Sequence, residues 1–531
     1  MFVKSWKISN FPLLFFTMRL LPVLLLLSLH AFTQERPNII YIMSDDHDAD
    51  AISAYNKDLL QTPGFDRIAN EGMRFNRCFV GNSICSPARA TLLTGQHSHK
   101  NGVKDNRTKF DGSRVTLPKL LGQAGYQTAI VGKWHLHSYP TGFDYWKVLP
   151  GMGQYFDSRI INMSGDTVQT KGYATDAITD EAINWLDNRD KRKPFAFFVH
   201  HKAPHRYFLP PLKYLEKFHT KKFPEPPTLY ADTAGHGSAW RIQTMSILND
   251  MRLCSDLKVD PAYLMDDPDF KPDSTEIAYH RAIFRRVPEE ERKRMQEIYA
   301  ERGRILKEQR PRGRELLKWK YQWYMQDYIA CVASIDENVG RLLKYLDETG
   351  LSKNTVVIYT SDQGFYLGEN GWFDKRFMYD VSMGTPLMVR WPGKTKPHSV
   401  SNAMVQNIDF APTILDIAGA KIPDTMQGKS LVPIISGKQK SLNRPFLYYH
   451  YYEFGKDHTV IPHLGIRGDR YKLIYFYTAN EWELYDLHDD PREQHNLIRS
   501  AKHQSLIADL KRELNRQRDL YDDHEPAGEL H

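Results

Sequence analysis

The chain has few cysteines for its length, and no part of it repeats. Its 531 residues include only four cysteines, at positions 78, 85, 254 and 331. A framework of many disulfides is therefore excluded, although the sequence leaves open whether any one pair is bridged. The absence of internal repeats and low-complexity tracts excludes a repeat architecture. What remains is a globular protein too long for one small core, built from two domains or from one large domain with an appendage.

Long apolar runs are also scarce. The only strongly apolar segment runs from Leu20 to Leu29, between Arg19 and the small-residue stretch Ala31-Phe32-Thr33-Gln34. A basic residue, a short apolar stretch and a small-residue exit are typical of a cleaved secretory signal. The segment is too short for a confident membrane span. The sequence thus predicts a signal peptide over residues 1–33, no membrane span after its cleavage, and an exported protein that is periplasmic or secreted.

Neither sign of charge dominates. The chain has 71 Lys and Arg against 64 Asp and Glu, a formal net charge of +7, and we expect no nucleic-acid partner. The basic excess is local, because residues 281–320 hold fourteen Lys and Arg against seven Glu. A pair of solvated, salt-bridged helices would account for this segment, and so would a basic wall that attracts a polyanion.

Short apolar runs that end in polar residues recur along the chain. They lie at residues 37–43, 75–80, 127–132, 194–200 and 355–360, with helical patterns between them, for example at 175–188 and 324–348. Strands that alternate with helices predict an α/β fold, a large and mostly parallel sheet sandwiched by helices. Because such sheets bind ligands at the carboxyl ends of their strands, we expect one site at one edge of the sheet.

Two segments depart from this alternation. Residues 206–320 contain Pro-rich turns and then charged helices, and we interpret them as an insertion that shapes substrate access. After Gly437, four short strand patterns at 446–452, 464–467, 471–477 and 482–486 precede a helical pattern at about 505–520. The sequence therefore predicts a large domain over residues 34–437 and a smaller C-terminal subdomain with an antiparallel sheet over residues 438–531.

The most informative stretch is Cys85-Ser86-Pro87-Ala88-Arg89, followed by Ala90-Thr91-Leu92-Leu93-Thr94-Gly95. A lone cysteine here would be a buried residue in a turn before a helix. The full pattern, C-x-P-x-R with a trailing L-T-G, instead resembles the type I sulfatases of the alkaline phosphatase-like superfamily. In that family a maturation enzyme oxidises the cysteine to formylglycine. The hydrated aldehyde suits sulfate esters, since one hydroxyl attacks the sulfur and the second can later expel the sulfate.

Oxygen-bearing side chains follow two of the predicted strands. Asp45 and Asp46 end the first, and Asp362 and Gln363 end the last. Strand-end aspartates often cap a following helix, so either pair alone would be weak evidence. Together they form an all-oxygen set that suits Ca²⁺, or Mg²⁺, better than zinc. The resemblance implies the same four residues as metal ligands, together with the formylglycine from Cys85.

Basic and histidine side chains lie near the same strand ends. Arg89 is one helical turn beyond Cys85, Lys133 and His135 alternate at a strand end, and Lys375 follows the loop after Asp362. Each alone would be a surface charge, but together they supply the preorganised cations that a sulfuryl-transfer transition state requires. The resemblance assigns sulfate-binding and catalytic roles to these four residues.

The sequence predicts different roles for four histidines. His205 is the candidate general acid for the departing sugar oxygen, a role that the resemblance also supports. His200 and His201 lie nearer their strand and are interpreted as packing or supporting residues. We expect His463, in the C-terminal meander, to reach back over the pocket to the substrate.

The resemblance covers nearly the whole mature chain, with two departures. Gln363 stands where asparagine or histidine is common, and Met383-Gly384-Thr385 lacks a frequent arginine. Stretches such as 51–56 and 201–206 resemble bacterial polysaccharide sulfatases. These include enzymes for 6-sulfated N-acetylglucosamine of glycosaminoglycans and enzymes for algal polysaccharides such as ulvan. The expected substrate is thus a sulfated polysaccharide or its oligosaccharides, with the sugar and the sulfate position left open.

Two other functions compete with the sulfatase. A phosphatase or phosphodiesterase of the same superfamily would normally use Ser or Thr as its nucleophile and bind two zinc ions through several histidines, which the oxygen-only set disfavours. A non-catalytic binder of sulfated glycans would result if Cys85 is never oxidised.

Overall fold

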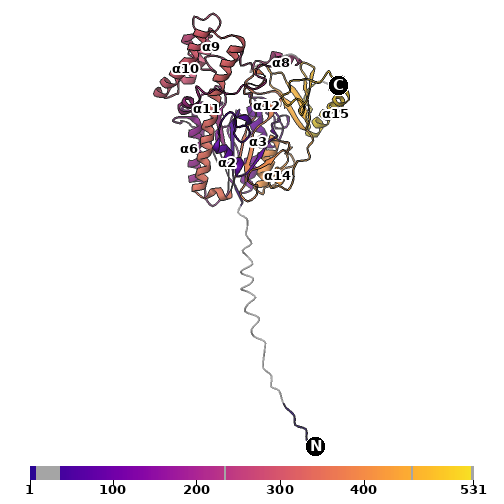
Figure 1. Ribbon diagram of the computed structural model, residues 1–531. Helices are drawn as coiled ribbons and strands as arrows, with labels where there is room; N and C mark the ends of the chain where they lie inside the picture. Colours follow the sequence, from indigo (N-terminus) through magenta and orange to yellow (C-terminus); the bar gives the residue numbers. More distant parts are fainter. Residues whose placement is uncertain (7–35, 233–234, 456–457, 528–531) are drawn as a thin grey trace. The chain divides into compact units, whose positions relative to one another are not determined.

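A computed structural model describes residues 1–6, 36–232, 235–455 and 458–527 (Figure 1). By their contacts, Pro37–His531 form one compact unit, and Met1–Arg36 are a separate one. Residues 7–33 of the predicted signal peptide lie outside the described residues. Among the helices that are described, none is both long and apolar enough to span a bilayer.

A ten-stranded sheet forms the centre of the larger unit. Its strands, in spatial order, are β11 (Ser399–Ser401), β2 (Met73–Phe75), β10 (Leu387–Arg390), β9 (Thr355–Ser361), β1 (Asn38–Asp45), β8 (Phe195–Pro204), β4 (Gln127–Lys133), β5 (Tyr145–Leu149), β6 (Arg159–Asn162) and β7 (Thr167–Gln169). The five strands from β9 to β5 run parallel, and antiparallel partners extend the sheet at both sides. The prediction of a mostly parallel sheet is confirmed.

Alternate residues of the central strands supply two separate cores. On β1, Ile40 and Ile42 pack on one face, and Ile39, Tyr41 and Met43 pack on the other. Because side chains alternate across a strand and both faces are covered, the strand reads as a continuous apolar run.

Helices on the first face include α2 (Pro63–Asn70), α6 (Ala174–Asn188) and α11 (Gly313–Glu348), and on the second α3 (Cys85–Thr94), α5 (Leu117–Gln123) and α13 (Phe410–Ile417). Helix α11 starts well before the predicted residue 324 and is the longest helix on the first face (Figure 1).

The predicted strand at residues 75–80 is wrong. The chain leaves the large sheet after Phe75 and forms β3 (Cys78–Phe79), which pairs with β12 (Val405–Gln406) in a separate two-stranded sheet. The polar pair Asn76-Arg77 lies at the break, where the backbone N–H of Asn76 donates to the carbonyl of Ser401. An apolar run that is interrupted by two polar residues therefore contributes one strand to each of two sheets.

The C-terminal residues form the predicted antiparallel sheet. Its strands are β13 (Leu447–Tyr451), β14 (His463–Arg467), β15 (Tyr471–Phe476) and β16 (Glu481–Asp486), and α15 (Gln504–Tyr521) covers one face. The other face packs against aromatic residues that follow β9, such as Tyr366 and Trp372. Figure 1 shows this sheet and α15 in yellow and orange beside the central sheet.

Residues 206–320 contain α7 (Leu212–Phe218), α8 (Ser238–Ile242), α9 (Ser274–Phe284) and α10 (Glu289–Gln309). Several basic residues of this segment form ion pairs, for example Arg294 with Glu216 and Arg304 with Glu301. These pairs favour the salt-bridged helices over a continuous basic wall. All four cysteines are buried and free, so none of them is bridged.

Candidate active site

Five segments meet at the carboxyl edge of the parallel strands. Asp45 ends β1, Lys133 ends β4, His205 directly follows β8, Asp362 directly follows β9, and Cys85 begins α3. Strands β1 and β9 are in register up to Ser44 and Ser361, which places Asp45 and Asp362 side by side. The fold therefore brings these predicted residues to one edge of the sheet.

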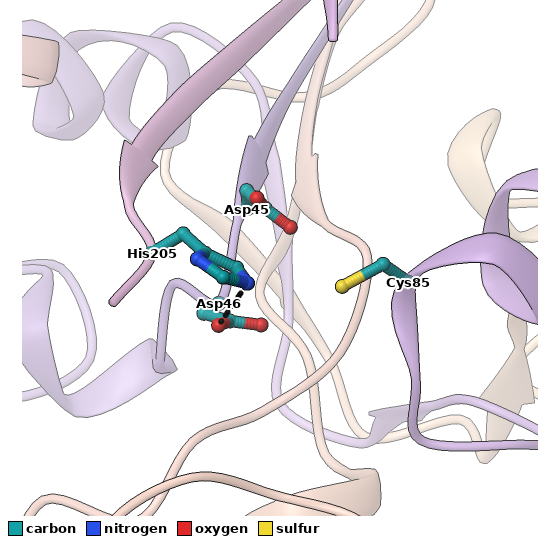
Figure 2. A group of neighbouring side chains, drawn as sticks. All are labelled: Asp45, Asp46, Cys85 and His205. Atoms are coloured by element: carbon teal, nitrogen blue, oxygen red, sulfur yellow. Dashed lines mark ion pairs between the residues drawn. The ribbon is translucent and has the colours of Figure 1, made fainter. Parts of the chain in front are cut away.

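Cys85 is fully buried at the first position of α3. Its Sγ and one ligand atom each from Asp45, Asp46 and His205 all lie within 4.8 Å of one another, and Figure 2 shows these four side chains converging. Burial raises the pKa of the Cys85 thiol well above its usual value. An unmodified thiol is thus held neutral, and a neutral thiol is a poor nucleophile.

Buried cations surround these groups. The Nη2 of Arg89 lies 2.9 Å from Oδ2 of Asp362 and 3.5 Å from Oδ1 of Asp45. Lys133 forms an ion pair with Asp45, and the Nζ of Lys375 lies 2.7 Å from Oδ2 of Asp46. Three positive side chains thus converge on the carboxylates that the sequence predicted.

Three carboxylates crowd the centre of the site. Burial raises the pKa of Asp362 to about 7 and that of Asp46 to about 6. Burial acts on Asp45 in the same direction, but Lys133, His205 and Arg89 outweigh it and hold its pKa well below the usual value. Buried carboxylates this close repel one another unless a cation lies between them.

Gln363 completes the oxygen set. Its Nε2 donates to Oδ1 of Asp46, while its Oε1 is buried and has no hydrogen-bond partner among the described residues. An orphaned amide oxygen beside three carboxylates is the donor set that a hard divalent cation prefers. The residues therefore fit a divalent metal.

His205 and His135 lie at the same edge. The Nδ1 of His205 donates to the carbonyl of Arg206 at 2.7 Å, and its Nε2 lies 3.6 Å from Oδ2 of Asp46. Burial lowers the pKa of both histidines well below the usual value. The backbone at His135 has a φ of 55°, and its buried Nδ1 has no partner among the described residues. All the predicted site residues on the strand ends and on α3 are thus brought together.

The structure agrees with the expectation for two of the other histidines and contradicts the expectation for the third. His200 and His201 are buried on β8, and the Nδ1 of His200 lies 3.2 Å from the carbonyl of Lys133, as expected of a supporting residue. The expectation for His463 is wrong. Its ring is fully buried, stacks on Tyr449 and Tyr451, and accepts from the backbone N–H of Met378 at 3.1 Å. Packing within the core keeps it from the substrate.

Other buried charges beside the site were not predicted. Asp374 and Arg376 flank Lys375, with φ values of 76° and 101°, and Arg376 is paired with Asp374 and Glu453. Left-handed backbone at two non-glycine residues is costly and often found at functional sites. The available signal was the charged triplet 374–376 between aromatic residues. Lys202 lies in the stretch 201–206, for which the sequence predicts no individual role at this position.

Comparison with known proteins decides the family. A sequence model of the sulfatase family matches residues 37–420, and a model described as "N-sulphoglucosamine sulphohydrolase, C-terminal" matches residues 368–520. The chain belongs to the sulfatase family. The predicted resemblance is thereby confirmed, and the protein is a sulfuric ester hydrolase.

Individual relatives cover nearly the whole sulfatase. An N-acetylglucosamine-6-O-sulfatase of Bacteroides thetaiotaomicron is 46% identical over 498 residues, which are 93% of this chain and 88% of the relative. An ulvan-active sulfatase of Formosa agariphila is 26% identical over 91% of this chain and 81% of the relative. A solved structure in complex with its substrate D-glucosamine-2-N,6-O-disulfate is 46% identical, has a TM-score of 0.89, and is aligned over 93% of this chain and 100% of its own.

Proposed function

We propose that this sulfatase removes the 6-O-sulfate of glucosamine units, N-acetylated or N-sulfated, in fragments of a sulfated glycosaminoglycan. The similarity to the N-acetylglucosamine-6-O-sulfatase carries the proposal, because the 46% identity extends over 93% of the chain. Ulvan is the weaker candidate substrate, since the ulvan-active relative is only 26% identical.

The proposed nucleophile is a formylglycine made from Cys85 by a maturation enzyme. Its support is the C-x-P-x-R motif, the position of Cys85 among the carboxylates, and the neutral state of the buried thiol. In the hydrated aldehyde, a hydroxyl replaces the thiol as the attacking group.

The proposed metal is calcium, held by Asp45, Asp46, Asp362, Gln363 and the modified Cys85. Such an ion would screen the sulfate from the carboxylates and polarise its oxygens. Arg89, Lys133, His135 and Lys375 would bind the sulfate oxygens and stabilise their developing charge. His205 would protonate the departing sugar oxygen.

The proposal includes export and a domain division. Residues 1–33 would be a cleaved signal that delivers the enzyme to the periplasm or the medium, where glycan fragments are encountered. Residues 34–437 would form the catalytic domain, with the insertion 206–320, and residues 438–531 the C-terminal subdomain.

A substrate panel tests this function. Matured enzyme is incubated with N-acetylglucosamine 6-sulfate, its 3-sulfate and 4-sulfate isomers, and sulfated ulvan oligosaccharides, and released sulfate is measured. We expect release from the 6-sulfate alone. Faster release from the ulvan fragments, or from another isomer, would replace the proposed substrate.

A further inference from the structure

A cavity of about 330 Å³ opens beside His205. Its walls are the 152–156 loop after β5, residues 202–209 at and beyond the end of β8, and one side of α9 continued by Arg286. This volume is at the lower end of the range for small-molecule sites. Since the insertion supplies α9, the cavity depends on a segment outside the strands that build the catalytic centre.

Lys202 is one of the cations that line the cavity. It is 5% exposed, and its Nζ lies 4.8 Å from the centre of the Tyr155 ring. Unlike Lys133 and Lys375, which are paired with Asp45 and Asp46, Lys202 forms no ion pair with a carboxylate of the described residues. A buried lysine without a carboxylate partner is costly in the absence of a ligand.

Arg286 is a second cation that lines the cavity. Its Nη1 donates to the carbonyl of Asp157 at 3.0 Å, and its buried Nε has no partner within the described part of the chain. Tyr207 and Tyr279 lie beside it with ring centres 5.8 Å apart, and Tyr279 is 45% exposed. The aromatic walls and the under-used donors suit a sugar that carries an anion.

The third cation of the cavity is already neutralised. The Nε and Nη2 of Arg206 lie 2.6 and 2.7 Å from the two carboxylate oxygens of Asp256. A bidentate pair leaves this guanidinium little capacity for a ligand. The charge available to a ligand is therefore that of Lys202 and Arg286.

We propose that this cavity binds a second, non-reacting anion of the substrate through Lys202 and Arg286. The inference rests on the proposed function, because the sugar whose oxygen His205 protonates must lie beside His205, and this cavity is next to it. An N-sulfate on the same glucosamine and the carboxylate of a neighbouring uronic acid share the required chemistry.

Three substrates and two variants test the proposal. N-acetylglucosamine 6-sulfate has no second anion, glucosamine 2-N,6-O-disulfate has one on the same ring, and a uronic acid linked to N-acetylglucosamine 6-sulfate has one on the neighbouring ring. For Lys202→Met and Arg286→Gln, we expect kcat/KM to fall about tenfold on the substrate whose anion is bound, chiefly through KM. On N-acetylglucosamine 6-sulfate it should stay within about twofold. The substrate that shows the loss identifies the source of the anion.

Arg285→Gln is the matched control. Arg285 is the preceding residue but lines a different cavity with Arg281 and Arg292, so all three substrates should react as with the wild type. Lys202→Arg should restore the preference for the doubly charged substrate, and thermal unfolding midpoints verify that each variant is folded.

Equal losses on all three substrates would place Lys202 at the scissile sulfate and overturn the inference, and so would the absence of any loss. Either result leaves the proposed function standing if the wild type hydrolyses N-acetylglucosamine 6-sulfate. If the wild type hydrolyses none of the three substrates, both this inference and the proposed function are overturned.

Discussion

The Nε2 of His205 lies 3.6 Å from Oδ2 of Asp46, and this nitrogen has no proton when the ring is neutral. The proton of the neutral ring is on Nδ1, because Nδ1 donates to the carbonyl of Arg206. Only a protonated ring can therefore donate from Nε2. Burial lowers the pKa of His205, and a bound sulfate would oppose that shift through its negative charge. In the proposed mechanism, a bound anionic substrate would therefore favour the protonated ring, which can donate a proton from Nε2.

His205→Ala should affect substrates according to their leaving group. A sugar alkoxide is a poor leaving group, so the variant should lose roughly 10²–10⁴-fold in kcat on a sulfated sugar. On an aryl sulfate with an acidic phenol, if the wild type accepts one, it should retain much more activity. Steady-state kinetics on both substrates measure the difference.

Lys375→Ala is the comparison for this test. Lys375 is paired with Asp46 and should bind sulfate from any ester, so its loss should lower both rates together. Equal losses in His205→Ala, with a selective loss in Lys375→Ala, would transfer the acid role to Lys375.

Cys85→Ala should abolish turnover without unfolding the protein, because no other group can supply the diol. Cys85→Ser should also be inactive unless the host's maturation enzyme accepts serine. Cys78→Ala is the control, since Cys78 is buried in β3, is not one of the side chains that converge with Asp45 and Asp46, and should be dispensable for turnover. Mass spectrometry of the peptide around residue 85 should detect the aldehyde, and an unmodified thiol throughout an active preparation would refute the mechanism.

Removal of divalent metal should lower both activity and the thermal unfolding midpoint, and calcium should restore both. A ligand that binds only the folded state stabilises it, so the midpoint reports binding independently of turnover. Asp362→Asn should raise the calcium concentration needed for rescue, whereas Asp58→Asn, at an exposed site, should not. Stoichiometric zinc without calcium or magnesium in the purified enzyme would contradict the oxygen-only site.

The sheet edge that carries the candidate site could be predicted, because its residues directly follow apolar runs. Asp45, Lys133 and Asp362 each terminate a pattern that is typical of a buried parallel strand, and parallel strands place their carboxyl ends together. The meeting of these side chains at one edge therefore followed from the position of each residue at the end of a predicted strand. The boundaries were less reliable, as the division of residues 75–80 between two sheets shows.

The cavity beside His205 and the position of His463 could not be predicted, because both depend on tertiary packing. The cavity exists only where α9, distant in sequence, lies against the residues that follow β8. The burial of His463 depends on Tyr449, Tyr451 and Phe377 from other segments. No hydrophobic periodicity in the sequence near the cavity residues or near His463 indicates these long-range contacts.

A buried ion cluster should be essential for attaching α10 to α11. Asp327 is fully buried and accepts from both Nη atoms of Arg302 at 2.8 Å and from Nζ of Lys258 at 2.9 Å. Asp327→Ala would leave two buried cations unpaired and should lower the free energy of unfolding by about 3–5 kcal/mol. Glu301→Ala removes the exposed partner of Arg304 and should lower the free energy of unfolding far less, and urea titration measures both variants. If the two variants lower the free energy of unfolding by similar amounts, the buried cluster is not essential.

Asp336 links helix α11 to the start of α2. Its carboxyl accepts from the backbone N–H of Phe65 at 2.8 Å, and Gly64 lies so close that an added Cβ would be 2.3 Å from the carbonyl of Asp336. Burial raises the pKa of this carboxyl to about 7. The unfolded chain therefore ionises at lower pH than the folded one, and the contribution of Asp336 to stability falls as pH rises from about 4 to about 7.

Asp336→Asn should remove that fall, because the amide oxygen can accept the same hydrogen bond without ionising. The difference in unfolding free energy, variant minus wild type, should become more positive by about 2 kcal/mol between pH 5 and pH 8. Urea unfolding at both values measures it. Asp347→Asn, on the same helix, removes a carboxylate whose pKa is lowered by its hydrogen bond to Arg67, so its difference should stay constant above pH 5. A constant difference for Asp336→Asn as well would show that Asp336 is already ionised at pH 5.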